Sequence, residues 1–324
     1  MAETLQKSGP SGAIAASETG KPSRRKKAPL TGRAKEERRL GWLLCAPAII
    51  AMLLVTGYPI VYALYLSLQR YDLRDPAAKE FVGLQNYVTV LTSSTWWQDF
   101  FNTAIITVVS VSIELVLGMI IALVMHRAIF GRGPVRTAIL IPYGIITVVA
   151  AFAWKYAFDP TSGFVAGLPL VPDDYAPLTD KSGSLFVIIL AEVWKTTPFM
   201  ALLLLAGLAL VPDELHEAAK VDGASAWQRF WRITIPLMKP AILVALLFRT
   251  LDAFRIFDSA YIIQPGGANG TETVSILGYN VLISRVNLGL GSAISVLIFI
   301  CVILIAVFFV KGLGASTAQQ RGEV

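Results

Sequence analysis

Residues 214–240 read ELHEAAKVDGASAWQRFWRITIPLMKP, a charged stretch that contains one glycine and two prolines. The chain on either side is apolar over lengths that can cross a bilayer, since about 20 apolar residues span the hydrocarbon core. The bilayer itself does not require so long a polar segment between two spans. The pattern of this segment is therefore the first indication of what the protein does.

The composition is that of a membrane protein. The chain has 324 residues, of which 55% are hydrophobic and only 15% charged, whereas soluble domains carry about 25% charged residues. The formal net charge of +6 does not indicate nucleic-acid binding, because the basic residues gather in loops and in the N-terminal arm, as membrane topology alone requires. Cys45 and Cys301 both lie in apolar runs, and no Cys and His spacing indicates a metal site.

The apolar runs predict an all-α polytopic protein with six membrane-spanning helices. Their expected ranges are 43–68, 100–125, 135–158, 185–210, 241–263 and 288–310. They form one body, 40–312, which follows an arm (1–39) predicted to be disordered or interfacial and precedes a short tail (313–324). Lys and Arg concentrate in the arm, the tail and the loops after the second and fourth spans, which places both termini and residues 211–240 in the cytoplasm.

The quoted segment is predicted to form two short helices. Pro212 and the acids after it favour a helix start, and Gly223 allows the left-handed turn that ends a helix. Ser225 and Gln228 have the spacing of a capping box, which opens the second helix. Pro236 and Pro240 are expected to break the chain before the fifth span. A plain amphipathic helix on the membrane surface would explain Trp227 and Trp231, but not the Ala, Gly and Pro pattern.

That pattern resembles a known family. The residues Glu217-Ala218-Ala219 and Asp222-Gly223-Ala224 resemble the EAA loop of permease subunits in binding-protein-dependent ABC importers. Three further stretches are similar to the carbohydrate branch of that family, the maltose and glycerol-phosphate permease type: FVGLQNY at 81–87, EVWKTTPF at 192–199 and FRIFD at 254–258. Taken whole, the chain is most similar to permease subunits of trehalose importers.

The resemblance implies the type I ABC importer permease fold and a coupling helix that docks on a cytoplasmic ATPase. The implied coupling residues are Glu217, Ala218, Ala219, Asp222, Gly223 and Ala224. The implied partners are a second, homologous permease, two copies of the ATPase and an extracytoplasmic sugar-binding protein or lipoprotein. ATP and Mg would be bound by the ATPase subunits, and this chain would hold no cofactor. The expected location is the bacterial inner membrane.

Charged residues inside the predicted spans are the second feature to explain, because a charge facing lipid is costly. Four of them recur at three-residue steps and can pair along one helical face: Arg249, Asp252, Arg255 and Asp258. They form either a structural ion-pair ladder or the polar wall of a substrate path. Candidates for that path, chosen as polar groups for sugar hydroxyls and aromatic faces for sugar rings, are Asp252, Phe254, Tyr261, Asn280 and Trp194. Glu114, in the second span, is either a buried, hydrogen-bonded group or the partner of a basic residue elsewhere, and it is assigned no functional role.

The sequence therefore predicts a transport subunit that moves a sugar, trehalose by resemblance, through alternating access driven by separate ATPase subunits. Another sugar or a glycerol phosphate derivative is the alternative substrate. An ion-coupled secondary transporter would use the charges in the spans and usually has an inverted repeat, which we do not find. A membrane-embedded enzyme would need a nucleophile and base together, and the chain has no such constellation and no ATPase motif.

Overall fold

The computed structural model describes residues 32–127, 132–165, 168–169, 172, 176–312 and 314. The chain divides into two compact units, residues 1–58 and 59–324. In the first unit, helix α1 (Gly32–Met52) is followed by a π-helical turn, η1 (Leu53–Gly57). The helix begins inside the arm that the sequence predicts to be disordered or interfacial, and residues 1–31 of that arm lie outside the described residues.

The second unit holds everything that follows. Helix α2 (Tyr58–Ser67) leads to a small antiparallel pair of strands, β1 (Gln69–Arg70) and β2 (Glu80–Phe81), in which Gln69 faces Phe81. A short 3-10 turn, η2 (Pro76–Ala78), lies between the strands. Helix α3 (Gln85–Thr92) comes next, and Asn86 ties it to β1 by donating to the carbonyls of Ser67 and Gln69.

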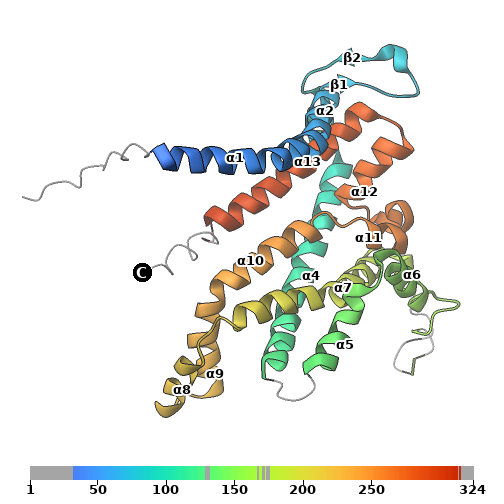
Figure 1. The fold of residues 1–324 in the computed structure, drawn as a ribbon. Coiled ribbons are helices and arrows are strands. Elements are labelled where there is room, and N and C mark those ends of the chain that lie inside the picture. The colour runs from blue at the N-terminus through green and yellow to red at the C-terminus, as the bar shows by residue number, and fades with distance from the viewer. Residues whose placement is uncertain are drawn as a thin grey trace, which may run out of the picture. The chain divides into compact units, whose positions relative to one another are not determined.

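Long apolar helices make up most of the second unit (Figure 1). They are α4 (Ser94–Arg127), α7 (Lys181–Leu208), α10 (Ile235–Ala253) and α13 (Leu288–Val307). Between α4 and α7 lie α5 (Arg132–Gly144), α6 (Thr147–Ala157) and the 3-10 turn η3 (Pro177–Thr179). Over the described residues, five helices are long and apolar enough to cross a membrane, and six spans result if the bent α5–α6 pair counts as one.

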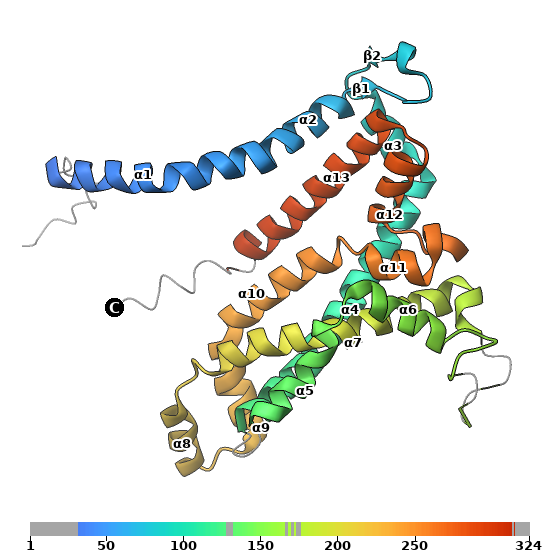
Figure 2. The same ribbon diagram turned by 45° about the vertical axis from the view of Figure 1, so that its right-hand side comes forward.

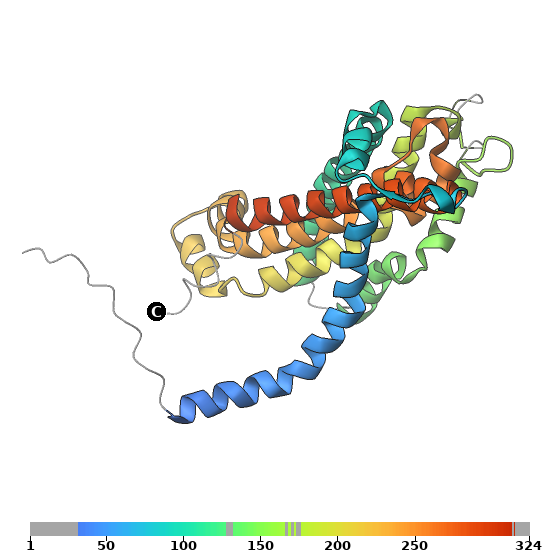
Figure 3. The same cartoon turned by 90° about the horizontal axis from the view of Figure 1, so that it is seen from above.

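The shorter elements lie at the two ends of the bundle formed by α4, α7 and α10. Helices α8 (Asp213–Val221) and α9 (Ala226–Arg229) lie at one end, and Figure 2 shows α6 and α11 (Asp258–Ile263) at the other. The view from above shows the same arrangement of these short helices at opposite ends of the bundle (Figure 3). After α11 come a 3-10 turn, η5 (Pro265–Gly270), helix α12 (Val274–Tyr279) and π-helical η6 (Asn280–Ser284), and π-helical η7 (Phe308–Gly312) continues α13.

Two predicted spans differ from straight helices. The third, 135–158, is bent by 91° between Gly144 and Thr147. The fifth, 241–263, stops at Ala253 and resumes as α11 at Asp258. Within this break Phe254 is buried in one apolar cluster and Ile256 in another, so the chain passes from one cluster to the next and leaves the helical path. The sequence analysis also missed α12, which is too short and apolar to separate from a loop by pattern alone.

Three apolar clusters hold the second unit together. The α10 core joins α4, α7 and α10 through residues such as Met119, Met200, Leu204 and Met238. The α11 core joins α6, the first half of α7, α11 and α12, with Ile188, Ile263 and Ile276 at its centre. The α13 core joins α3, α4, α12 and α13 and includes Trp96 and Ile294.

Helices α7 and α10 approach each other closely at Gly207. A Cβ atom placed on Gly207 would overlap the Cβ of Ala241 and would lie 3.8 Å from its Cα. The overlapping atom is the Cβ of an alanine, which is fixed by the backbone and cannot move aside as the end of a long side chain can. The small residue therefore sets the distance between the two helices, as small residues do at helix contacts in membranes.

We expect Gly207→Val to destabilise the folded protein, because overpacking of a close contact costs about 1–3 kcal/mol. The measurement is the thermal unfolding midpoint of the purified protein in detergent. Gly133→Val is the matched control, since nothing lies within 4 Å of a Cβ at that helical position. Equal midpoints for the two variants would contradict the close contact.

Candidate functional site

The polar segment between α7 and α10 has a well-defined backbone. Helix α8 starts after Pro212 with Asp213 and Glu214 in its first turn, where acidic side chains favour the positive end of the helix dipole. It ends at Gly223, whose φ of +79° is left-handed. The amide of Gly223 donates to Lys220 and that of Ala224 to Ala219, at 3.0 and 2.8 Å. These two bonds complete the Schellman motif, so the glycine fixes the turn after α8.

The next turn is fixed just as firmly. The Ser225 hydroxyl accepts from the amide of Gln228 at 3.2 Å, and the Gln228 side chain accepts from the amide of Ser225 at 2.8 Å. This is the predicted capping box, and it opens α9. The predicted chain break before the fifth span is wrong, because α9 continues through the π-helical turn η4 (Phe230–Thr234) into α10. The wider turn lies just before Pro236, which has no amide to donate, so the helix accommodates both prolines.

The residues predicted to contact an ATPase lie on the surface of this segment. Glu217, Ala218, Asp222 and Gly223 are exposed, while Ala219 and Ala224 are half-buried. A cavity of about 400 Å³ opens between α8 and the start of the α9 helix. It is lined by Ala219, Asp222, Gly223, Ala224, Gln228, Arg229, Arg232 and Ile233. Arg229 donates to the carbonyl of Ala224 at 2.8 Å and so ties the two short helices together.

Aromatic rings cover the neighbouring face. Trp227 and Trp231 are 70% and 51% exposed, and their ring centroids lie 5.6 Å apart. Phe230 lies between them in sequence and packs on the α10 core. The segment thus has two faces, one polar and hollowed, the other aromatic.

A cluster of charged side chains lies in the interior, between the long helices. Arg249 of α10 is 1% exposed and Glu114 of α4 is 0% exposed. The guanidinium donates to both oxygens of Glu114, at 2.5 and 3.0 Å. It also donates to Glu192 of α7 at 3.0 Å and to Asp252 at 2.8 Å. One guanidinium is therefore shared by three carboxylates, a use that suits the fixed fork of arginine.

Two hydroxyls complete the cluster. Thr196 donates to Glu114 at 2.8 Å, and Ser259 of α11 donates to Glu192 at 2.5 Å. The cluster joins α4, α7, α10 and α11. Glu114, to which the sequence analysis gave no role, is the most buried member of this cluster. Its signal in the sequence is a lone carboxylate in the middle of an apolar span, which must find a partner inside the protein.

The predicted ladder is only partly formed. Arg249 and Asp252 pair as expected on one helical face. Arg255 instead donates to the carbonyl of Leu251 at 3.3 Å and is exposed. Asp258 begins α11, beyond the end of α10, so the three-residue spacing no longer places it on the same helical face. The break in the fifth span is the physical reason for this correction.

The candidates for a substrate path lie in different settings. The Asp252 side chain is 66% exposed, with one oxygen bound to Arg249. Trp194 is 38% exposed and its ring meets that of Trp154 edge to face at 5.9 Å. Tyr261 stacks on Phe257 at 5.3 Å, and Asn280 donates to Glu272 at 2.7 Å.

Phe254 differs from the other candidates. It is 4% exposed and packs edge to face on Phe100 at 6.0 Å, within the α13 core. This position in the core departs from the expectation of an aromatic face turned to a substrate. Tyr279, by contrast, is 37% exposed and packs on both Phe257 and Tyr261.

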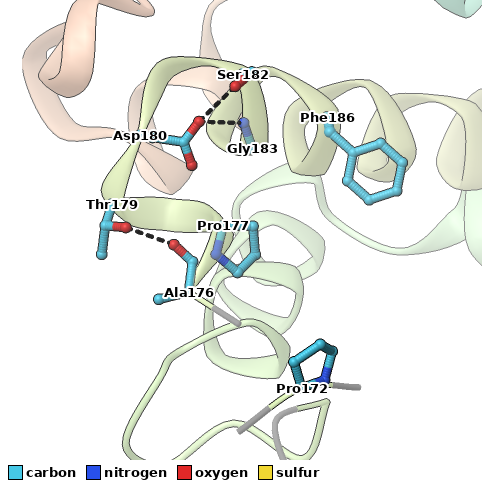
Figure 4. Close-up of a pocket in the computed structure, with 8 residues that line it drawn as sticks. All are labelled: Pro172, Ala176, Pro177, Thr179, Asp180, Ser182, Gly183 and Phe186. Carbon is cyan, nitrogen blue, oxygen red and sulfur yellow. Dashed lines mark hydrogen bonds between the residues drawn. The ribbon is translucent and has the colours of Figure 1, made fainter. Parts of the chain in front are cut away.

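A second hollow lies at the start of α7, at the end opposite to α8. It has a volume of about 580 Å³ and includes Pro177, Asp180, Ser182 and Phe186 (Figure 4). Asp180 caps α7 by accepting from the Ser182 hydroxyl at 2.6 Å and from the Gly183 amide at 3.0 Å. These hydrogen bonds, the one from Ser182 first, lower the pKa of Asp180. The carboxylate is thus a fixed negative group on the rim of this hollow.

The comparison with known families accounts for this arrangement. Residues 88–318 match the model of the binding-protein-dependent transport system inner membrane component. The chain belongs to this family. It is therefore an inner membrane component of an ABC importer, and α8 and α9 contain the residues whose pattern resembles an EAA loop.

Individual relatives agree with this family. The chain is 58% identical over 286 residues to the trehalose transport system permease protein SugA of Mycobacterium tuberculosis, which covers 88% of this chain and 92% of that protein. It is 39% identical to the trehalose/maltose transport system permease protein MalF of Thermococcus litoralis, over 87% of this chain and 96% of that protein.

Solved structures support the fold. The crystal structure of a bacterial ABC transporter that imports the acidic polysaccharide alginate superposes with a TM-score of 0.74, at 22% identity. The match covers 88% of this chain and 99% of that one. The predicted class, an all-α permease of the type I importer fold, is confirmed.

The buried cluster gives a prediction about stability. Arg249→Leu should destabilise the fold by about 3–5 kcal/mol, because it leaves a buried carboxylate without its partner. Arg249→Lys should restore only part of this loss, since an ammonium cannot bind Glu114 through two parallel bonds. The thermal unfolding midpoint in detergent measures both.

Arg255→Leu serves as the control for this pair of variants, because Arg255 is exposed and donates to a backbone carbonyl. The double variant Glu114→Leu with Arg249→Leu should be more stable than Arg249→Leu alone. If the double variant is the less stable of the two, Glu114 is not the carboxylate that needs Arg249.

Proposed function

We propose that this chain is the permease subunit that carries a sugar, specifically trehalose, through an ABC importer. One observation supports the mechanism above all. The helix that leaves the coupling segment, α9–η4–α10, runs without a break from Ala226 to Ala253 and carries Arg249 and Asp252 near its far end. A displacement of the exposed segment would therefore move the charged groups inside the bundle.

The coupling segment has the properties that docking on another protein requires. Its backbone is fixed by the Schellman motif and the capping box, so a force on it does not simply deform it. Glu217 is exposed and available for a basic residue of the ATPase. Ala218 and Ala219 allow a close approach, and the cavity beside Gly223 would receive a side chain of the partner.

The substrate path is proposed to pass Asp252, Trp194 and Tyr261, none of which is fully buried. An exposed carboxylate in the membrane-spanning part cannot face lipid without a large cost, so Asp252 faces water or the second permease. Carboxylate and amide groups such as Asp252 and Asn280 would bind sugar hydroxyls, and Trp194 and Tyr261 would offer aromatic faces. The basic charge of Arg249 is offset by three carboxylates, which favours a neutral sugar over a phosphorylated one.

The proposed assembly has one copy of this chain, a second homologous permease, two ATPase subunits and an extracytoplasmic sugar-binding protein or lipoprotein. The ATPase subunits would bind ATP and Mg and carry out all hydrolysis. Both termini and the coupling segment would lie in the cytoplasm, as the distribution of Lys and Arg predicts. The hollow at Asp180 would then lie on the outer face, where the binding protein arrives.

The assignment of trehalose as the substrate is tested with the complex purified from native membranes in mild detergent. We expect an ATPase and a second six-span protein to co-purify, and trehalose-loaded binding protein to stimulate ATP hydrolysis. Stimulation by another sugar with no response to trehalose would discard trehalose and keep the mechanism. Purification of the chain alone, with solute movement driven by an ion gradient, would contradict the importer.

The coupling role predicts that Glu217→Lys and Gly223→Pro each abolish uptake while the protein still inserts in the membrane. Lysine reverses the charge offered to the ATPase, and proline cannot adopt the left-handed φ of residue 223. Uptake of labelled sugar and the amount of chain in the membrane are measured together.

Glu80→Lys is the control for the charge reversal, because it makes the same change in the β2 strand, outside the coupling segment. It breaks an exposed ion pair with Arg70, and exposed pairs contribute little to stability. Normal uptake of labelled sugar by the Glu217→Lys variant would contradict the proposed coupling role of α8.

A further inference from the structure

The charged cluster lies at the boundary between two of the apolar cores. On α7, residues up to Ala191 belong to the α11 core, and residues from Met200 onward belong to the α10 core. Glu192 and Thr196 occupy the interval between them. The two cores, called the two bodies below, are thus distinct apolar clusters on either side of this polar pair, and the helices α4 and α7 run through both.

Glu192 connects the two bodies with its two oxygens. One oxygen accepts from Arg249 on α10 at 3.0 Å. The other accepts from the hydroxyl of Ser259 on α11 at 2.5 Å. The non-helical residues 254–257 lie between α10 and α11, so this side chain bridges the break in the fifth span.

Helix α11 is otherwise attached to α6, α7 and α12. Lys155 of α6 donates to the carbonyl of Ile262 at 3.1 Å, and Gln264 donates to the carbonyl of Leu178 and the hydroxyl of Ser184, at 2.8 and 2.6 Å. Ala260 and Ile263 pack in the α11 core. The bridge through Glu192 is therefore a polar link from this body to α10, the helix that continues the coupling segment.

Arg249 keeps two other carboxylate partners if Glu192 withdraws. Its bidentate bond to the fully buried Glu114 holds the guanidinium in place, and Asp252 lies one helical turn away on the same helix. Both of these partners remain if Glu192 withdraws, so the positive charge stays paired. The bridge can open without leaving Arg249 buried and unpaired, which would be costly.

We propose that Ser259 and Glu192 are positioning residues that form a clasp between the two bodies, closed in the state described here and opened during transport. Closed, the clasp holds α11 and the start of the following loop in a fixed position relative to α10. When the clasp is open, α10 can move relative to α11. The clasp is a two-state element between the coupling segment and the substrate path.

The inference rests on the proposed function, so it is tested by two readouts, one of which needs no partner. In the purified chain, Ser259→Ala should raise amide hydrogen exchange of α11 by about threefold or more, the factor by which loss of one hydrogen bond shifts an equilibrium. Exchange in the middle of α4 should not change. Ser259→Thr keeps the hydroxyl and should restore slow exchange.

In the assembled importer, Ser259→Ala should raise ATP hydrolysis in the absence of binding protein by about threefold or more, and lower the sugar carried per ATP. If Ser259 only stabilised the fold, its loss would lower the rate of ATP hydrolysis and the amount of sugar transported together. The ratio of the rate with binding protein to the rate without it would then stay unchanged. Ser110→Ala is the control, because this buried hydroxyl donates to Thr107 within its own helix. In a Glu192→Ala background, Ser259→Ala should add no further change.

Unchanged exchange in α11, or an unchanged ratio of stimulated to basal hydrolysis in Ser259→Ala, would overturn the clasp. Failure of the wild-type complex to respond to any sugar would instead count against the proposed substrate. The exchange measurement on the purified chain still decides the clasp in that case.

Discussion

The interior of this protein depends on keeping one guanidinium paired. Arg249 is 1% exposed between the long helices, and a buried charge left without a partner there would be strongly destabilising. The carboxylates that satisfy it come from α4, α7 and α10 itself. These helices must therefore be present, in register and at close distance for the fold to be stable. The contact at Gly207 also holds α7 and α10 close together, at a different level of the bundle from the charged cluster.

The sequence alone predicted the architecture because lipid imposes strong rules on it. Apolar length predicted the spans, and the sequence of residues 214–228 predicted the Gly223 turn and the Ser225–Gln228 capping box; the structure has both local motifs. What pattern could not predict is pairing between distant helices. Glu114 and Arg249 are 135 residues apart, and nothing in their local spacing connects them. The ladder proposed from three-residue steps assumed an unbroken helix, and the break at Phe254–Phe257 invalidates the second half of it.

Contacts between distant segments also decide which aromatic candidates are exposed, and the sequence pattern could not predict them. Phe254 and Tyr261 have the same chemistry in the sequence, yet one packs in the α13 core and the other lies in a partly exposed stack with Phe257 and Tyr279. The difference is made by which apolar cluster each segment joins after the break. Side-chain type narrows the candidates for a sugar path, but only the tertiary fold separates core rings from surface rings.

The unbroken helix from Ala226 to Ala253 has a further consequence for how this subunit can vary. Each residue of an α-helix turns the chain by about 100° and advances it by about 1.5 Å. One residue added or removed between the coupling segment and Arg249 would rotate the guanidinium away from Glu114 while every residue type stayed the same. The number of residues between α9 and Arg249 is therefore constrained more strongly than their types. This stretch can accept many substitutions, but an insertion or deletion would change how Arg249 is oriented relative to the exposed segment.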